Sequence, residues 1–204
     1  NDFSGDGLLT NEEFFTVESK FFNKDLSGLF DMPLWKMVDV ISNTVLAEKV
    51  YTAIKNFDKN ALEKLDAFGI NLVANSHQNY PKRLIKKMKV DSPILLYCLG
   101  DETLLNKKST AVIGARQIDE SGKKFAFDIG ESVAKEQKVL VSGGARGSDL
   151  EATKSAILNG GKAIWFVAVP VDEVVKNRMV KEWIETGKLL VCWDCNPFAP
   201  FSSK

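Results

Sequence analysis

Two glycine-rich loops contain the residues of this chain that could do chemistry. One runs from Val139 to Asp149 (VLVSGGARGSD), where an apolar run ends in glycines before the helix-like residues 150–159. The other runs from Thr110 to Arg116 (TAVIGAR) and ends in an arginine. A strand that breaks into glycines and restarts as a helix points backbone N–H groups and the positive end of the helix dipole at one spot. The two loops therefore predict an anion-binding cleft suited to phosphate.

The side chains and glycines of these loops have separable roles. Gly143, Gly144 and Gly147 allow a positive φ and a close approach of the backbone to a ligand. Arg116 follows Gly114 by two residues, where a guanidinium could hold the same phosphate through two hydrogen bonds. The loop lacks the glycine spacing of a dinucleotide-binding motif and the Gly-Lys-Ser/Thr of a P-loop. The alternative is a tight strand-to-helix turn without a ligand.

The elements that must position these loops begin at Gly69. Short apolar runs of strand length cover 70–74, 94–98, 110–114, 138–141, 163–169 and 189–193, and helical patterns cover 120–136, 150–159 and 175–186. Unbroken apolar strands separated by helices predict an α/β, Rossmann-like, mostly parallel sheet with helices on both faces. Ligands of such sheets bind beyond the C-terminal strand ends, where both glycine loops fall.

The first part of the chain has a different pattern. We expect residues 1–67 to form a small all-helical region and 68–204 to form the Rossmann-like domain. Thr10 and Glu13 have the spacing of a capping box before an apolar helical run. Helical spacing continues over 34–41 and 45–57. A further helix is expected to start at Asn60 with Glu63 and to end at Gly69.

The charge distribution is uneven. The chain has 204 residues and a formal net charge of zero, with 45% hydrophobic and 26% charged residues, which is typical of a globular protein. Residues 1–66 contain seven basic and twelve acidic residues, whereas 82–124 contain ten basic and five acidic ones. The lysines and arginine of 82–89, and those of 123–124, could extend a track for nucleic acid, because a local basic face can bind it in a neutral chain. A solvated amphipathic helix is the other reading of the 82–89 run.

Cysteine and histidine usage favours no redox, zinc or triad site. The chain has three cysteines, and this odd number predicts a reducing, cytoplasmic location without a disulfide framework. Cys192 and Cys195 form a C-x-x-C at a strand end, and only Cys98 and His77 remain as further zinc ligands. We interpret the cysteines as buried or incidental and His77 as a turn residue. No apolar stretch approaches bilayer length, and we expect no membrane association.

A calcium-loop pattern occurs at the start of the chain. Asp2, Ser4, Asp6 and Glu13 occupy loop positions 1, 3, 5 and 12 of an EF-hand. No incoming helix precedes them and no partner EF-hand follows. The other reading is a polar lead-in that caps the first helix through Thr10 and Glu13, and we therefore assign no metal.

Five segments in order resemble the DNA-processing protein DprA (Smf) family, over about Phe68 to Trp193. They are 69–84 with its Tyr-Pro turn, the Pro-x-x-Leu-Tyr-x-x-Gly type segment 91–100, Leu104-Leu105, the Gly-x-Arg strand 111–116, and the Ser-Gly-x-Ala-x-Gly-x-Asp type loop 142–149. The resemblance implies a Rossmann-like domain that binds single-stranded DNA without cutting it. It also implies a homodimer that protects the strand and loads the RecA recombinase in DNA uptake or recombination, with no cofactor and no enzymatic activity.

The resemblance also implies roles for individual residues. Arg116 would hold a phosphate, the loop glycines would form a backbone cradle, and Ser142 and Asp149 would shape the loop. The full set assigned to the phosphate- or DNA-binding site, by contact or by shaping the loop, is Gly114, Arg116, Lys123, Ser142, Gly143, Gly144, Arg146 and Gly147.

The chain departs from the family pattern in several places. Thr153 stands where the family usually has His, the second Tyr-Pro is missing near 174–177, and Cys192 to Asp194 replace the usual Ser-Glu. Relative to the family the domain is expected to be incomplete at its C-terminal end. The same strand-glycine-helix unit also resembles the LOG family of nucleoside monophosphate N-glycosidases. In that alternative Glu151 would be the acid/base residue.

Overall fold

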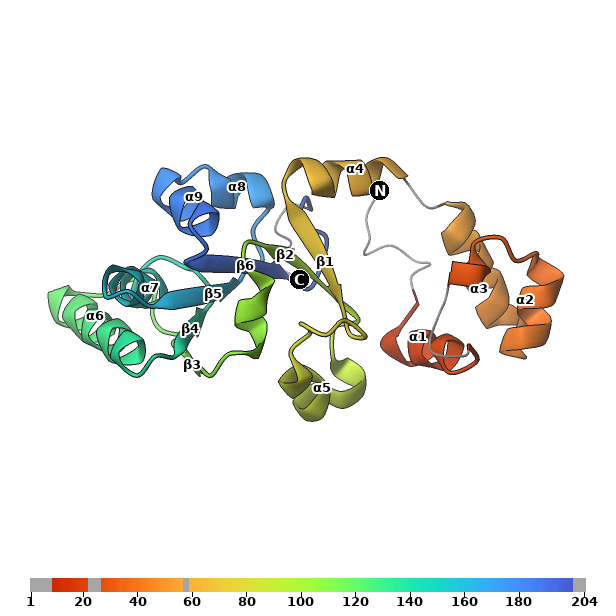
Figure 1. The fold of residues 1–204 in the computed structure, drawn as a ribbon, viewed down its shortest axis with the longest axis horizontal. Coiled ribbons are helices and arrows are strands. Elements are labelled where there is room, and N and C mark those ends of the chain that lie inside the picture. Colours follow the sequence, from red (N-terminus) through yellow and green to blue (C-terminus); the bar gives the residue numbers. More distant parts are fainter. Residues whose placement is uncertain (1–8, 22–26, 57–58, 200–204) are drawn as a thin grey trace. The chain divides into compact units, whose positions relative to one another are not determined.

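The computed structural model describes residues 9–21, 27–56 and 59–199, and Figure 1 shows its helices and strands. The chain divides into two compact units. Unit 1 is made of Asn1–Lys64 and Arg83–Ile94, and unit 2 is made of Leu65–Lys82 and Leu95–Lys204.

Unit 1 is helical. Its elements are α1 (Asn11–Glu18), η2 (Ser27–Leu29), α2 (Leu34–Ile41), α3 (Thr44–Lys55), most of α4 (Lys59–Ala67), most of α5 (Lys82–Met88) and η3 (Lys89–Asp91). Their apolar side chains form one core from Val17, Leu29, Met37, Ile41, Leu46, Ala47 and Val50. The expected helices over 34–41 and 45–57 are present, with α3 capped by the Asn43 side chain.

The capping box at the start of α1 is confirmed. The Glu13 N–H donates to Thr10 Oγ1 at 3.2 Å, and the Thr10 N–H donates to Glu13 Oε2 at 2.7 Å. Lys49 Nζ donates to the same carboxylate oxygen at 2.7 Å, and this bond from α3 lowers the pKa of Glu13. Glu13 therefore has intramolecular partners, and the other calcium-loop positions, Asp2, Ser4 and Asp6, lie outside the described residues.

The start of α4 differs from the prediction. The helix begins at Lys59, so Asn60 lies within its first turn and not at the cap position. Its end agrees with the prediction. The N–H groups of Phe68 and Gly69 donate to carbonyls of the last turn, and Gly69 adopts a φ of 69°, which a glycine tolerates without strain.

Unit 2 is built on a six-stranded, mostly parallel sheet. The strands are β1 (Ile70–Ala74), β2 (Leu95–Leu99), β3 (Ser109–Ala111), β4 (Val139–Ser142), β5 (Lys162–Phe166) and β6 (Leu189–Trp193), in the order β1-β2-β6-β5-β4-β3. The β3, β4, β5 and β6 strands are parallel, and β2 pairs antiparallel with both β1 and β6. The prediction of an α/β, Rossmann-like fold is confirmed.

The connecting helices follow the strands as βαβ units. They are α6 (Glu120–Lys135), α7 (Ser148–Leu158), α8 (Val171–Val175) and α9 (Arg178–Glu185), while η4 (Glu102–Asn106) precedes β3. Because β3 to β6 follow one another in a single direction across the sheet, right-handed crossovers place α6 to α9 on one face, whereas helices were expected on both faces. One core cluster agrees, because it joins buried residues of these helices with Leu140, Ala163 and Leu189, which are register partners. The opposite face of β5 carries η4, whose N-cap Asp101 pairs with Lys162 at 3.3 Å.

The helix expected over 175–186 is present as α9 but starts later, and a separate short helix, α8, precedes it. The α8 helix ends at Val175, and α9 starts at Arg178. The Asn177 side chain accepts hydrogen bonds from the N–H groups of Met179 and Val180, so it serves as the N-cap of a new helix. The β3 and β5 strands are also shorter at their C-terminal ends than predicted, ending at Ala111 and Phe166.

The three cysteines are free thiols. Cys98 and Cys192 are register partners in β2 and β6, both are buried, and their Sγ atoms lie 3.8 Å apart. The hydrogen bond with Cys98 and burial raise the pKa of the Cys192 thiol. Cys195 is exposed, and His77 lies exposed in a turn as predicted, with its Nδ1 accepting from the Asn79 N–H. Among the described helices, none is both long and apolar enough to cross a membrane.

Candidate phosphate-binding site

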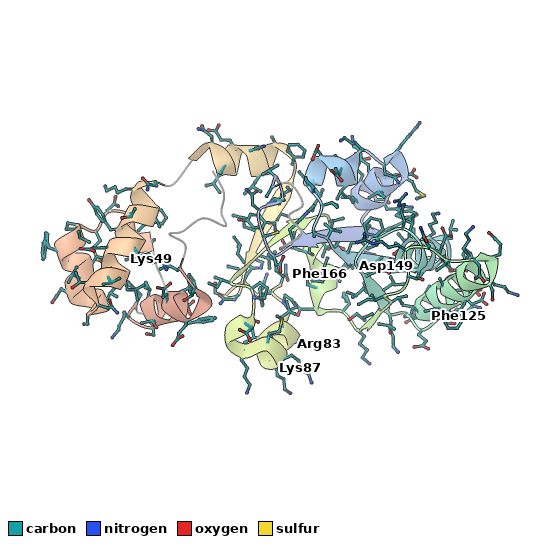
Figure 2. The ribbon with its side chains drawn as sticks, turned by 180° about the vertical axis from the view of Figure 1, so that it is seen from behind. Lys49, Arg83, Lys87, Phe125, Asp149 and Phe166 are labelled. Atoms are coloured by element: carbon teal, nitrogen blue, oxygen red, sulfur yellow. The ribbon has the colours of Figure 1, made fainter. Side chains whose placement is uncertain are left out.

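A single carboxylate joins the two glycine loops. Asp149, in the first turn of α7, accepts the Gly114 N–H at 3.1 Å through Oδ1 and the Gly143 N–H at 3.2 Å through Oδ2. Its side chain is only 4% exposed, and Figure 2 labels its position. Because these loops follow β3 and β4, the carboxylate fixes the C-terminal ends of two neighbouring strands to the start of α7. The structure therefore gives Asp149 a loop-shaping position.

The loops also touch through their backbones. A Cβ on Gly147 would lie 2.3 Å from the Ala115 carbonyl oxygen and 2.7 Å from that of Arg116, and Gly147 has a φ of 85°. The Ser148 N–H donates to the Ala115 oxygen at 3.1 Å. This approach is open only to glycine, because any side chain at 147 would collide with backbone. It brings the backbone of Arg116 beside the start of α7.

A tryptophan supports the glycine loop from the sheet. A Cβ on Gly144 would lie 2.6 Å from the Trp165 indole, so the ring of this β5 residue packs directly against the loop. The indole N–H donates to Thr153 Oγ1 at 2.9 Å, and Thr153 Oγ1 donates to the Asp149 carbonyl oxygen at 2.8 Å. Sequence reasoning missed this buried chain of contacts. The only signal was Thr153 in place of the family's histidine.

Four consecutive amides of the loop remain available as donors. Within the described part of the chain, the N–H groups of residues 144–147 have no hydrogen-bond partner. The amides of Gly114 and Gly143, which we expected to contact phosphate, are instead occupied by Asp149. Ser142, the last residue of β4, is 4% exposed, and its hydroxyl has no hydrogen-bond partner among the described residues. Unpaired donors at a helix N-terminus suit an anion.

The basic residues near these loops differ in their pairing. Arg116 and Arg146 are both exposed, and neither has a carboxylate partner among the described residues. Lys123, in the first turn of α6, pairs with Glu120 at 2.6 Å, and this hydrogen bond raises the Lys123 pKa. Of these three residues, the two arginines are therefore more available to an anionic ligand than Lys123.

The described residues offer little for catalysis. Among them, no three or more histidine, cysteine, aspartate or glutamate side chains gather as a metal site would require. Glu151, the acid/base residue of the N-glycosidase alternative, pairs with Lys154 at 2.8 Å.

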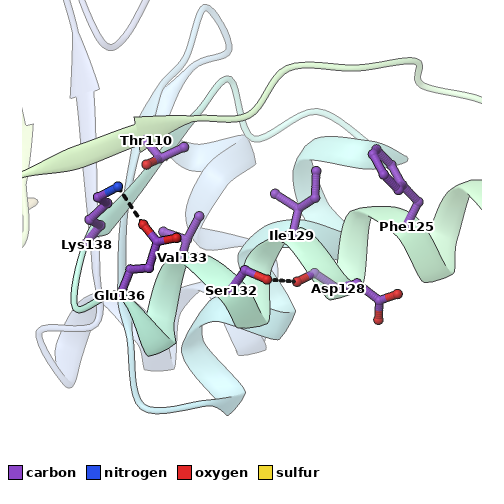
Figure 3. Close-up of a pocket in the computed structure, with 8 residues that line it drawn as sticks. All are labelled: Thr110, Phe125, Asp128, Ile129, Ser132, Val133, Glu136 and Lys138. Atoms are coloured by element: carbon purple, nitrogen blue, oxygen red, sulfur yellow. Dashed lines mark hydrogen bonds and ion pairs between the residues drawn. The ribbon is translucent and has the colours of Figure 1, made fainter.

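A groove lies between α6 and β3 (Figure 3). Its lining residues are Thr110, Phe125, Asp128, Ile129, Ser132, Val133, Glu136 and Lys138. Its polar side chains have internal partners, since Glu136 pairs with Lys138 and the Ser132 hydroxyl donates to the Asp128 carbonyl oxygen. The groove therefore adds no group of free polar side chains to the candidate phosphate-binding site.

The sequence and fold match known proteins. Residues 71–195 match the family described as DNA recombination-mediator protein A. DNA processing protein DprA of Streptococcus pneumoniae is 31% identical over 103 residues, which are 50% of this chain and 36% of that protein. Protein Smf of Borreliella burgdorferi is 24% identical over 189 residues, which are 91% of this chain and 52% of that protein.

Two solved structures are also similar. The X-ray structure of DNA processing protein A from Streptococcus pneumoniae has a TM-score of 0.68 and 26% identity, covering 93% of this chain and 64% of that one. A structure from Helicobacter pylori, described as showing a single-stranded DNA binding mode of DNA processing protein A, has a TM-score of 0.51 and 26% identity over 65% of this chain and 59% of that one. The present chain thus spans less than two thirds of these relatives.

Proposed function

The chain belongs to the DNA recombination-mediator protein A (DprA/Smf) family, and from this membership we propose that it binds single-stranded DNA through the phosphates of the strand. We assign the binding to the Rossmann-like region, residues 68–204. The observation that supports this assignment is the row of unpaired amides at 144–147 beside two unpaired arginines. Backbone donors and guanidinium groups are common partners of phosphate oxygens.

The proposed contacts follow from the local geometry. The amides of Gly144 to Gly147 hold one phosphate at the start of α7, and Arg116 and Arg146 hold the same or a neighbouring phosphate. Ser142 lies at the base of the loop with its hydroxyl buried, and we assign it to shaping the loop. Asp149 and Trp165 hold the loop in shape and do not contact DNA. Because such contacts reach only the backbone, base preference is slight and affinity falls with salt.

Further features of the proposal rest on the family alone. We propose that the protein acts without a cofactor and without cleaving DNA, in the cytoplasm and as a homodimer. It would protect the strand and load the RecA recombinase during DNA uptake or recombination.

Fluorescence anisotropy of a labelled oligothymidylate tests the proposal. The wild type should bind with a logarithmic salt slope of about −0.7 per neutralised phosphate. Arg116→Ala should weaken binding to all sequences alike and make that slope shallower by about 0.7. The unfolding midpoint of this variant should not change, because its side chain is exposed and unpaired.

A nucleoside monophosphate competitor separates the alternatives. Under the proposal it barely displaces the oligonucleotide. Protection of the protein by the monophosphate, without any DNA binding, would instead favour the N-glycosidase alternative. A loss of affinity in Arg116→Ala that is confined to some base sequences would contradict the phosphate role.

A further inference from the structure

A second cluster of unpaired cations lies outside the glycine loops. We name it the α5 basic surface, and its residues are Lys82, Arg83, Lys86, Lys87 and Lys89. All five side chains are exposed, and none has a carboxylate partner among the described residues. One acidic residue, Asp91, follows them within 82–94. Figure 2 shows Arg83 and Lys87 projecting from this helix.

In other helices of the chain, lysines form ion pairs with nearby carboxylates. The α6, α7 and α9 helices each pair a lysine with a carboxylate three or four residues away in the same helix, and Lys176, just after α8, pairs with Asp172 of that helix. In α5 the residues at these spacings are basic. Lys82 faces Lys86, and Arg83 faces Lys87, each four positions apart. Among the described residues, single exposed cations without an ion pair also occur elsewhere, such as Lys124 in α6, but α5 places several of them next to one another on one short helix.

This arrangement of charges does not stabilise the α5 helix itself. Like charges four positions apart on a helix repel each other, and basic residues in the first turn oppose the helix dipole. No residue of α5 is buried, so packing offers limited compensation. Lys89, just after the helix, also has a positive φ of 53°. An anionic ligand would relieve the repulsion, because it places opposite charge along the row of cations.

We propose that the α5 basic surface is a second binding site for the phosphate backbone of single-stranded DNA, separate from the glycine-loop site. The proposal rests on the proposed function and adds a contact surface to it. Residues three or four positions apart on a helix have Cβ atoms about 5–6 Å apart, so their charged side chains form a row that suits a ligand with repeated anionic groups. Ile85 and Met88, each 42% exposed, lie beside the cations and offer apolar surface to unstacked bases.

The test compares two double variants that remove the same charge. Arg83→Gln with Lys87→Gln removes two cations from the α5 basic surface. The control, Lys135→Gln with Lys138→Gln, removes two lysines that pair with Glu131 and Glu136 at the end of the sheet opposite the glycine loops. Both are measured by anisotropy with a long oligothymidylate at several salt concentrations, next to the wild type and Arg116→Ala.

The expected result is specific to the α5 variant. Its salt slope should be shallower by about 1.4, and its affinity near 0.1 M salt should fall roughly 25-fold, since each single-strand contact contributes about 0.7 to the slope. The control should bind like the wild type. The unfolding midpoint of the α5 variant should not fall, because the removed charges repel one another.

Three other outcomes overturn the inference in different ways. Wild-type affinity in the α5 variant, with a weakened Arg116→Ala, would remove the second site and leave the proposed function intact. Equal losses in the α5 variant and the control would mean a general effect of net charge. If the wild type itself binds no DNA, the proposed function fails and the inference fails with it.

Discussion

Replacing Asp149 by Asn should destabilise the protein more than a surface substitution of the same kind. Asp149 is buried, and its two carboxylate oxygens each accept one backbone N–H from a different glycine loop. An asparagine keeps one acceptor oxygen but turns an NH₂ group toward the other amide. One charge-assisted hydrogen bond is lost and two donors face each other, which should lower the free energy of unfolding by about 2 to 4 kcal/mol.

Urea unfolding measures this difference in the free energy of unfolding. The comparison requires that the variants and the wild type unfold with the same m-value. Asp128→Asn in α6 is the matched control, because Asp128 is exposed and the same charge is removed; its unfolding free energy should stay within about 0.5 kcal/mol of the wild type. Asp149→Asn should also weaken DNA binding at temperatures where it remains folded, since the amides at 144–147 lose their support. A stability equal to that of the wild type would refute the positioning role of Asp149.

The remaining predictions concern a glycine and an acid-range titration. Gly147→Ala should lower the free energy of unfolding by about 3 kcal/mol or more, because the new Cβ meets backbone oxygens; Gly160→Ala, with a similar φ of 80° but nothing within 4 Å, should lose only about 1 kcal/mol. Similar thermal shifts for both variants would contradict this. The Asp101 pKa is lowered, chiefly by the Thr103 hydroxyl, so its stabilisation is present above the unfolded value of about 3.8 and is lost as pH falls through the lower folded pKa. Asp101→Asn should therefore lose less stability between about pH 4 and 2 than the wild type. The same pH dependence of the free energy of unfolding in both proteins would contradict the role of Asp101.

Local sequence signals predicted the fold and the location of the candidate site. Apolar runs of strand length and helical spacing act over a few residues, so the alternation from Ile70 to Trp193 could be recognised without tertiary information. The glycine loops were placed correctly at the C-terminal ends of β3 and β4, because parallel strands end at the same edge.

The parts that could not be predicted depend on contacts between distant segments. Asp149 reaches Gly114 across 35 positions, and no local pattern showed that it would occupy that amide. In the sequence, Trp165 is an ordinary strand residue. Only the fold shows that its indole ring packs against Gly144 of the glycine loop. Cys98 and Cys192 become neighbours only through the β2–β6 register, although 94 positions separate them. The division of α8 from α9 did have a local signal, the capping residue Asn177.

A two-dimensional NMR titration shows whether the amides of the glycine loop contact DNA. Oligothymidylate is added to the isotope-labelled protein, and the N–H signals of residues 144–147 are followed. We expect downfield shifts of these amides on binding, because they gain phosphate partners, while the Gly114 and Gly143 amides, already bonded to Asp149, shift little. DNA binding that leaves the 144–147 amides unchanged would contradict the glycine loop as the phosphate site.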